Sequence, residues 1–211
     1  MGTLSNAGNQ IPTGIQLGLG VKPAAIQKIF LQGDFTQTQN PLDIAIEGKG
    51  FFQILQPNGQ FAYTRAGTFK LDSLGRIVTS EGLLVQPVTT IPIDAITISI
   101  DPTGNISVTQ PGNQVPAVVG TLQMATFQNA AGLQAVGNNL FLETGSSGPP
   151  IVGAPGLDDR GTLRQGFLEL SNVSVVEELV NLITAQRAYE VNSRTVQTAD
   201  EMLQIASNLK R

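Results

Sequence analysis

Residues 167–211 read FLELSNVSVVEELVNLITAQRAYEVNSRTVQTADEMLQIASNLKR. This segment contains neither glycine nor proline, the two residues that most often interrupt a helix, although the chain has 23 glycines and 12 prolines. Ser174 precedes Glu177 by three residues, which is the spacing of a capping box at a helix start. We predict one helix over Val175–Leu209. At 1.5 Å per residue it would be roughly 52 Å long, about twice the ~26 Å diameter of a small domain, and would project beyond the preceding body.

The apolar residues of the predicted helix recur every seven positions. This period is typical of a coiled-coil seam, in which one helix packs against another. Three positions further on in each repeat, alanines would let a second backbone approach closely, whereas Glu178 and Asn192 interrupt that row. Because an isolated helix is marginally stable in water, we expect it to need a partner. The predicted self-association seam consists of Val175, Leu179, Leu182, Ile183, Tyr189, Val196 and Leu203.

A second interpretation of the same residues is an amphipathic helix that lies on its own domain. Val176, Leu179 and Ile183 widen the apolar stripe near the start of the helix, as expected for such a packing. The two interpretations differ in what covers the stripe: another helix, or the body of the same molecule.

Residues 41–170 predict a β-rich body. Alternating apolar and polar residues at 42–46 are followed by a glycine turn and an apolar run at 51–55, and the pattern then continues at a spacing near ten residues. This spacing predicts an antiparallel barrel or sandwich-like body, so the fold class is mainly β with a long C-terminal α-helix. The further expected strands are 61–65, 68–71, 76–79, 83–85, 115–127 and 140–144, with a loop at 145–156, and residues 163–170 lead the chain back toward the helix.

Two segments of the body share the pattern Asp-x-x-Gly-x-Ile, at residues 72–77 and 101–106. We interpret this as the same hairpin-turn chemistry used twice, rather than as a duplicated domain. Residues 1–40 are polar and rich in glycine and proline, which predicts an extended arm or hairpin linker. The predicted organisation is therefore an arm at 1–40, a body at 41–170 and a coiled-coil helix at 171–211.

The composition excludes several classes of function. The chain has 211 residues, 41% of them hydrophobic and only 13% charged, with a formal net charge of −4. It should fold, but it offers no basic field for nucleic acid. With no cysteine and no histidine, thiol nucleophiles, the usual hydrolytic triads and the common zinc ligand sets are missing, and we expect no cofactor and no metal. We also expect no membrane insertion and no secretory signal.

Paired carboxylates are the remaining route to catalysis. Asp158 with Asp159, or Asp43 with Glu47, could be proposed as a glycosidase pair. Adjacent aspartates beside glycine are more often loop residues, and alternation would place Asp43 and Glu47 on the solvent side of a strand. Arg160 and Arg164 could bind an anion, but a solvated loop is the simpler interpretation. We therefore predict that the protein is not an enzyme.

Several long motifs, in order along the chain, resemble the bacterial flagellar rod and hook protein family. The run 40–52, NPLDIAIEGKGFF, is followed by YTRAG at 63–67 and GRIVT at 75–79, and the tail carries SNV at 171–173 and QRAYEVN at 186–192. Residues 17–21, LGLGV, and a single body of modest size fit the distal rod branch of the family. The motif residues that we single out are Asn40, Pro41, Leu42, Asp43, Gly48, Gly50, Phe51, Phe52, Arg65 and Gly67.

The resemblance implies a structural subunit that self-assembles into the helical flagellar distal rod, a rigid drive shaft transmitting torque from motor to hook. In this family the two terminal helices form an inner coiled-coil layer and the β body an outer layer. The resemblance also implies contacts with proximal rod, hook and surrounding ring proteins, a basal-body location across the periplasm, and export by the flagellar type III system. We further expect that a long N-terminal helix is missing from this chain, and that Met1 and Gly2 are an expression scar.

Two alternatives stay open at this stage. One is a hook-type or proximal rod subunit of the same family. The other, from a different class, is a β module that binds cell-wall glycan and carries a stalk helix, since surfaces rich in glutamine, asparagine and threonine can contact sugars.

Overall fold

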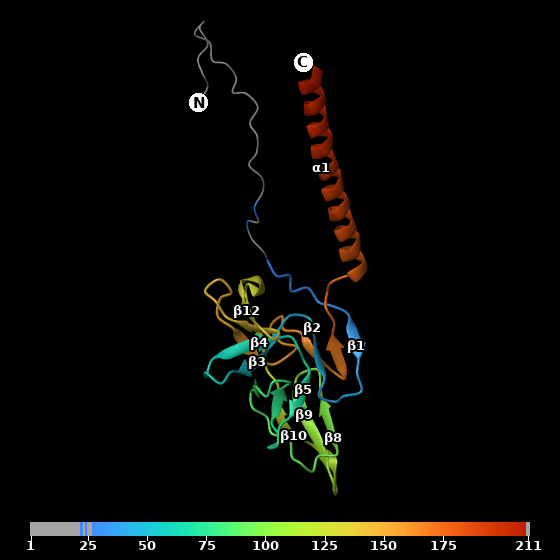
Figure 1. The fold of residues 1–211 in the computed structure, drawn as a ribbon. Helices are drawn as coiled ribbons and strands as arrows, with labels where there is room; N and C mark the ends of the chain where they lie inside the picture. The colour runs from blue at the N-terminus through green and yellow to red at the C-terminus, as the bar shows by residue number, and fades with distance from the viewer. Residues whose placement is uncertain (1–21, 23, 25–26, 210–211) are drawn as a thin grey trace.

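A computed structural model describes residues 22, 24 and 27–209. It consists of a β body from which a single long helix, α1 (Val175–Leu209), projects (Figure 1). The helix therefore has the bounds expected from the capping box and the absence of glycine and proline. Most of the arm predicted at residues 1–40 lies outside the described residues, which include its last part from residue 27 onward.

The largest sheet of the body has nine strands, all antiparallel to their neighbours. Its main path runs β12 (Gln134–Gly137), β13 (Leu140–Leu142), β4 (Phe61–Thr64), β3 (Phe51–Leu55), β7 (Leu84–Gln86), β6 (Ile77–Thr79) and β5 (Phe69–Leu71). Off this path, β11 (Met124–Thr126) pairs with β3, and β14 (Ile151–Gly153) pairs with β11; a short 3-10 turn, η1 (Ala130–Gly132), precedes β12.

Three smaller antiparallel sheets complete the body. A three-stranded sheet has the order β10 (Asn113–Thr121), β9 (Asn105–Gln110) and β8 (Thr97–Ile100). Two-stranded sheets are formed by β15 (Thr162–Gln165) with β2 (Ile44–Glu47), and by β1 (Phe35–Gln37) with β16 (Phe167–Glu169). The described sheets are open, so the sandwich-like expectation is confirmed and the closed barrel is wrong.

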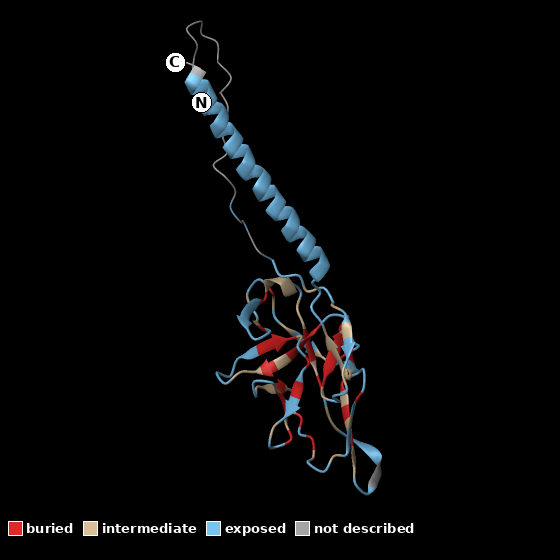
Figure 2. Cartoon of the chain, turned by 45° about the vertical axis from the view of Figure 1, so that its right-hand side comes forward, coloured by how far each residue is buried: buried red, intermediate tan, exposed pale blue. Residues whose placement is uncertain are grey.

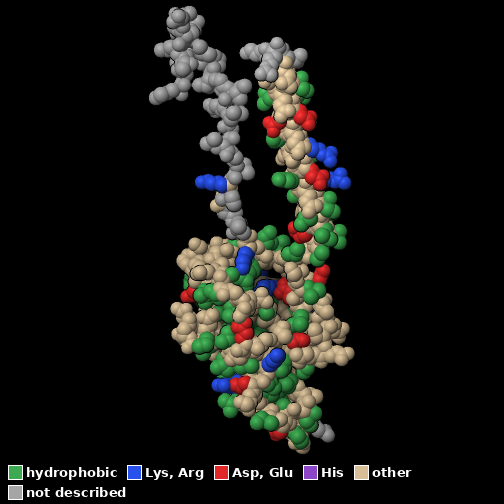
Figure 3. All heavy atoms as spheres, in the orientation of Figure 1, with side chains coloured by type: hydrophobic (Ala, Val, Ile, Leu, Met, Phe, Trp, Pro, Cys, Tyr) green, Lys and Arg blue, Asp and Glu red, His purple; other side chains and the backbone are tan. Residues whose placement is uncertain are grey.

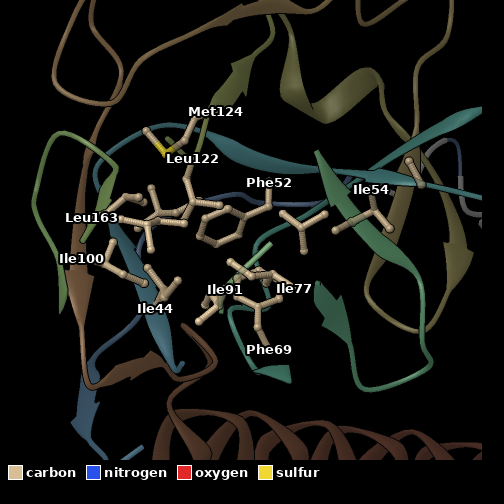
Figure 4. Close-up of a cluster of buried hydrophobic side chains, with 14 of the residues drawn as sticks. Ile44, Phe52, Ile54, Phe69, Ile77, Ile91, Ile100, Leu122, Met124 and Leu163 are labelled. Carbon is tan, nitrogen blue, oxygen red and sulfur yellow. The ribbon is translucent and has the colours of Figure 1, made fainter. Parts of the chain in front are cut away.

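One hydrophobic core joins the large sheet, the three-stranded sheet and the β2–β15 pair. Side chains from all three converge in Figure 4, where Phe52 of β3 lies near the middle of the cluster with Ile44, Ile100 and Leu163 on one side of it. Phe52 also meets Phe69 edge to face, with ring centroids 5.0 Å apart. Burial is confined to the body, and α1 is exposed along its length (Figure 2).

The repeated Asp-x-x-Gly pattern forms the same turn twice, as predicted. In each turn the aspartate carboxylate accepts hydrogen bonds from the amides two and four residues further on, at 2.8 and 2.9 Å for Asp72 and at 2.8 and 3.0 Å for Asp101. The third residue after the aspartate is Gly75 or Gly104, with φ of +77° and +89°, a conformation that disfavours other residues. The turns connect β5 to β6 and β8 to β9.

The structure corrects three details of the strand pattern. The strand expected at 115–127 is divided between β10 and β11, and the loop expected at 145–156 contains β14. Asp43 is buried rather than on the solvent side. The alternation rule fails here because Ile44, Ala45 and Ile46 are all buried, as in a strand covered on both faces. The Asp43 carboxylate accepts a hydrogen bond from the Asn40 side-chain amide at 2.9 Å.

Candidate functional site

The seven residues of the predicted seam are all exposed on α1. Their exposed fractions run from 51% at Ile183 to 77% at Tyr189, and every residue at 175–208 is exposed. Apolar side chains follow the helix from its base upward in Figure 3, with charged groups between them. In the structure, α1 does not lie on its own body, so the amphipathic alternative does not hold within the described residues.

The seam prediction missed apolar residues on another side of the helix. Val191, Met202 and Ile205 are also exposed, by 61%, 70% and 59%. At about 100° per residue, Ile205 lies about 200° around the axis from Leu203, so the distal half of α1 has two apolar sides. The signal was available in the sequence, because Val191 and Ile205 are two heptads apart on a row of their own.

The start of α1 is held by Ser174. Its hydroxyl oxygen accepts a hydrogen bond from the Glu177 amide at 3.4 Å, and its carbonyl accepts one from the Glu178 amide at 3.0 Å. The return bond from the Glu177 carboxylate to the Ser174 amide is absent among the contacts of the described residues. Both glutamates lie in the first turn, where negative charge interacts favourably with the helix dipole.

Two chain segments, which we call the neck (residues 29–37 and 167–173), connect α1 to the body. Strands β1 and β16 pair within it, and the Leu170 amide donates to the Asp34 carbonyl at 2.8 Å. The segments approach so closely at Gly33 that an added Cβ would lie 2.0 Å from the Leu170 carbonyl oxygen. Only glycine fits this crossing without a backbone shift.

Arg65 joins the neck to the body. Its Nε and one Nη donate to the two carboxylate oxygens of Glu169 at 2.9 and 3.0 Å, while the other Nη donates to the carbonyls of Gly48 and Gly50 at 3.0 and 3.2 Å. The Glu169 carboxylate also accepts a bond from the Gly33 amide at 3.1 Å. The two charged side chains are only 17% and 11% exposed, so this forked ion pair is shielded from solvent.

Asn172 holds the two neck segments together just before the helix begins. Its side-chain amide donates to the carbonyls of Ile29 and Leu31, at 3.3 and 3.1 Å. Between those residues, Phe30 packs edge to face against Phe51 and Phe141, with centroids 5.5 and 5.2 Å away. Residues 29–31, to which Asn172 is hydrogen-bonded, are therefore themselves packed against the body.

The family-motif residues lie where the neck meets the body and in the adjacent hydrophobic core. Phe52 points into the main core and Phe51 into the second cluster with Phe30. At Gly67 an added Cβ would lie 1.6 Å from the Ile44 carbonyl oxygen, which fixes the loop after Arg65 against β2. Gly48 and Gly50 have positive φ, and Asn40, Pro41, Leu42 and Asp43 form the turn that enters β2.

The residues considered for catalysis or anion binding have structural partners instead. Asp158 pairs with Arg160 at 2.7 Å, and Asp159 pairs with Lys49 at 2.7 Å on the surface, which lowers the pKa of Asp159. Arg160 is buried and donates to the Ala154 carbonyl at 2.9 Å, so the solvated-loop interpretation is wrong for it. Arg164 lies over the ring of Phe167, 4.4 Å from its centroid.

The described residues contain no group of three or more potential metal ligands. Among these same residues, no helix has the length and apolar character needed to span a bilayer.

Models of two protein families match two separate parts of the chain. The family model "Flagellar hook protein FlgE/F/G D1 domain" matches residues 45–108, and "Flagellar basal body rod FlgEFG protein C-terminal" matches residues 164–209. The chain is 50% identical over 206 residues to the flagellar basal-body rod protein FlgG of Caulobacter vibrioides, covering 98% of this chain and 79% of the relative.

Two further relatives show how far the similarity extends. The FlgG protein of Borreliella burgdorferi is 49% identical over 212 residues, covering 100% of this chain and 80% of the relative. The flagellar hook protein FlgE of Escherichia coli is 38% identical over 119 residues, covering 56% of this chain and 29% of the relative. Similarity to basal-body rod proteins thus extends over nearly the whole chain, and similarity to the hook protein over about half of it.

The described residues form a β body that carries, on a braced neck, a long helix with exposed apolar side chains, an arrangement that suits a structural subunit. The sequence matches agree with this class. The chain belongs to the flagellar rod and hook protein family, and within it is most similar to the distal rod protein. It is a structural subunit of the flagellar basal body rod.

Proposed function

We propose that this chain polymerises through the seam of α1 to build a rigid helical shaft. The observation that carries the proposal is the exposure of all seven seam residues, each by half or more. Five heptad side chains, buried at ~1.5–3 kcal/mol each, would contribute roughly 8–15 kcal/mol before ordering costs. That gain is large enough to drive association of a helix that is marginal by itself.

The form of the polymer follows from the asymmetry of the molecule. In a heterologous contact, two different surfaces of identical subunits meet, and such contacts generate an open helix when they do not close into a ring. With α1 helices aligned along the axis, they would form the inner layer and the β bodies the outer layer. The low charged fraction of 13% keeps repulsion between neighbouring copies small.

Within the flagellum, the shaft would transmit torque from the motor to the hook. The subunits would contact further copies of the chain, the adjacent proximal rod and hook proteins, and the surrounding ring proteins. We further propose that the rod spans the periplasm and that its subunits leave the cell through the flagellar type III system. The similarity to basal-body rod proteins supports these assignments.

Charge placed in the seam tests the proposal. In Leu182→Asp and Leu203→Asp, a carboxylate would have to be buried between helices, so we expect assembly to be lost while the β body stays folded. Sedimentation velocity over a concentration series measures assembly, circular dichroism measures folding, and complementation of motility measures function. Asn181→Asp, which adds the same charge about 160° around the helix axis from Leu179 and Ile183, is the matched control. Normal assembly and motility in both leucine variants would refute the seam.

A further inference from the structure

The direction of α1 relative to the body cannot be set by packing of the helix, because every residue at 175–208 is exposed. It depends on residues 170–174, which carry no regular secondary structure, and on whatever holds them. A linker of this kind would pivot freely unless side chains restrain it at more than one point.

The first restraint is the forked ion pair below the linker. Arg65 follows strand β4 of the body, and Glu169 ends strand β16 of the neck. The planar guanidinium uses two donors on Glu169 and a third on the backbone around Gly48, so both the position and the rotation of Glu169 are fixed. A lysine at this position could supply the charge but not the fork.

The second restraint is Asn172, which lies three residues beyond Glu169 and two residues before the cap Ser174. Its single amide group bridges two carbonyls, of Ile29 and Leu31, that flank the anchored ring of Phe30. Along the chain, Glu169 and Asn172 flank Leu170, whose carbonyl lies against Gly33, so the two restraints lie before and after this crossing. Two restraints on either side of a crossing resist rotation, whereas one alone would act as a pivot.

We propose that Arg65, Glu169 and Asn172 are positioning residues, forming a two-point clamp that fixes the angle between α1 and the body. The clamp makes the helix and the body one lever, so that force applied to one moves the other. It is a property of a single copy of the chain. The clamp can therefore be tested separately from polymerisation through the seam.

The absence of cysteine allows a direct measurement of the angle. Ser193→Cys on α1 and Ser99→Cys on β8, both exposed, place one spin label on the helix and one on the body. Electron double resonance of the dilute full chain then reports the distribution of distances between the labels. We expect one narrow distribution in the parent, and a distribution at least twice as wide in Arg65→Gln and in Asn172→Ala.

The controls separate the clamp from a general loss of stability. Arg76→Gln breaks an ion pair with Asp72 in a hairpin away from the neck, and Asn181→Ala changes an exposed asparagine of α1; both should keep the parental width. Arg65→Lys should give an intermediate width. If circular dichroism shows that Arg65→Gln unfolds the body, Glu169→Gln, which preserves the shape of the side chain, takes its place. If the distance distribution keeps the parental width in Asn172→Ala, or in the variant that breaks the Arg65–Glu169 pair, the two-point clamp is refuted.

Discussion

Asp101 holds its hairpin turn in the charged form. Side-chain hydrogen bonds from Thr103 and Asn105, at 2.6 and 3.1 Å, and backbone amides of the same residues lower the pKa of Asp101 to about 2. The pKa of a free aspartate is near 3.9, so the folded pKa is depressed. This group therefore contributes stability that is fully present above about pH 4 and is lost as the pH falls through about 2.

This pKa gives a prediction for Asp101→Asn. The variant should unfold at a lower urea concentration than the parent at pH 7, and the gap between the two midpoints should narrow as the pH falls from about 5 to about 2. Asp94→Asn, whose carboxylate accepts a bond from the Gln110 side-chain amide at 3.0 Å, is the comparison variant. A gap for Asp101→Asn that stays constant across this range would contradict the assignment.

Residue-level prediction from sequence worked where the interaction is local. The turn at Asp101 involves only its next four residues, so the pattern Asp-x-x-Gly was sufficient to predict it. Asp43 and Arg160 were misjudged because their surroundings come from distant segments. Asp43 pairs with Thr68 and its carbonyl accepts a bond from the Gly166 amide, while Arg160 lies against Gly153 of β14. Burial by residues that are distant in the sequence cannot be recognised from the local order of apolar and polar residues.

The side chain of Gln165 adds hydrogen bonds to the hydrophobic packing that joins the three-stranded sheet to the rest of the body. Its carbonyl oxygen accepts a bond from the Ile100 amide at 3.1 Å, and its amide donates to the carbonyls of Ile98 and Pro41 at 2.9 and 2.7 Å. Gln165 thus satisfies backbone groups at the edge of β8 that would otherwise lack partners.

We expect Gln165→Ala to destabilise the body by about 1–3 kcal/mol, because the partly buried Ile100 amide and Ile98 carbonyl lose their hydrogen bonds. The loss should appear as faster amide exchange at β8 and as a lower urea midpoint. Gln110→Ala, which removes exposed bonds to Asp94, should change the midpoint far less. Equal midpoints for the two variants would show that Gln165 does not join the sheets.

At the scale of elements, the sequence predicted α1 and most strands but not the neck. A helix of 35 residues without glycine or proline, with a cap at its start, leaves little choice of structure. The neck joins residues 130 or more positions apart through backbone pairing and through single side chains such as Asn172. Neither periodicity nor turn signals identify such partners, and β14 was missed because three residues between prolines and glycines resemble a loop.

The molecule consists of the β body and the projecting helix α1. The proposed function depends on which surface covers the apolar side chains of α1. The described residues leave the apolar side chains of α1 open to solvent, and a shaft built from many copies would cover them. This is the central claim, and it concerns a change of environment rather than a change of fold. It can be measured on the backbone of α1 itself.

Hydrogen–deuterium exchange over Val175–Leu209, in dilute chain and in assembled rods, tests the claim most directly. We predict fast exchange along α1 in the dilute chain, because the helix is held by its own hydrogen bonds alone. In the rods, exchange should become much slower across the seam, while exchange in the core strands changes little. Slow exchange of α1 in the dilute chain, or equally fast exchange in the rods, would contradict the account.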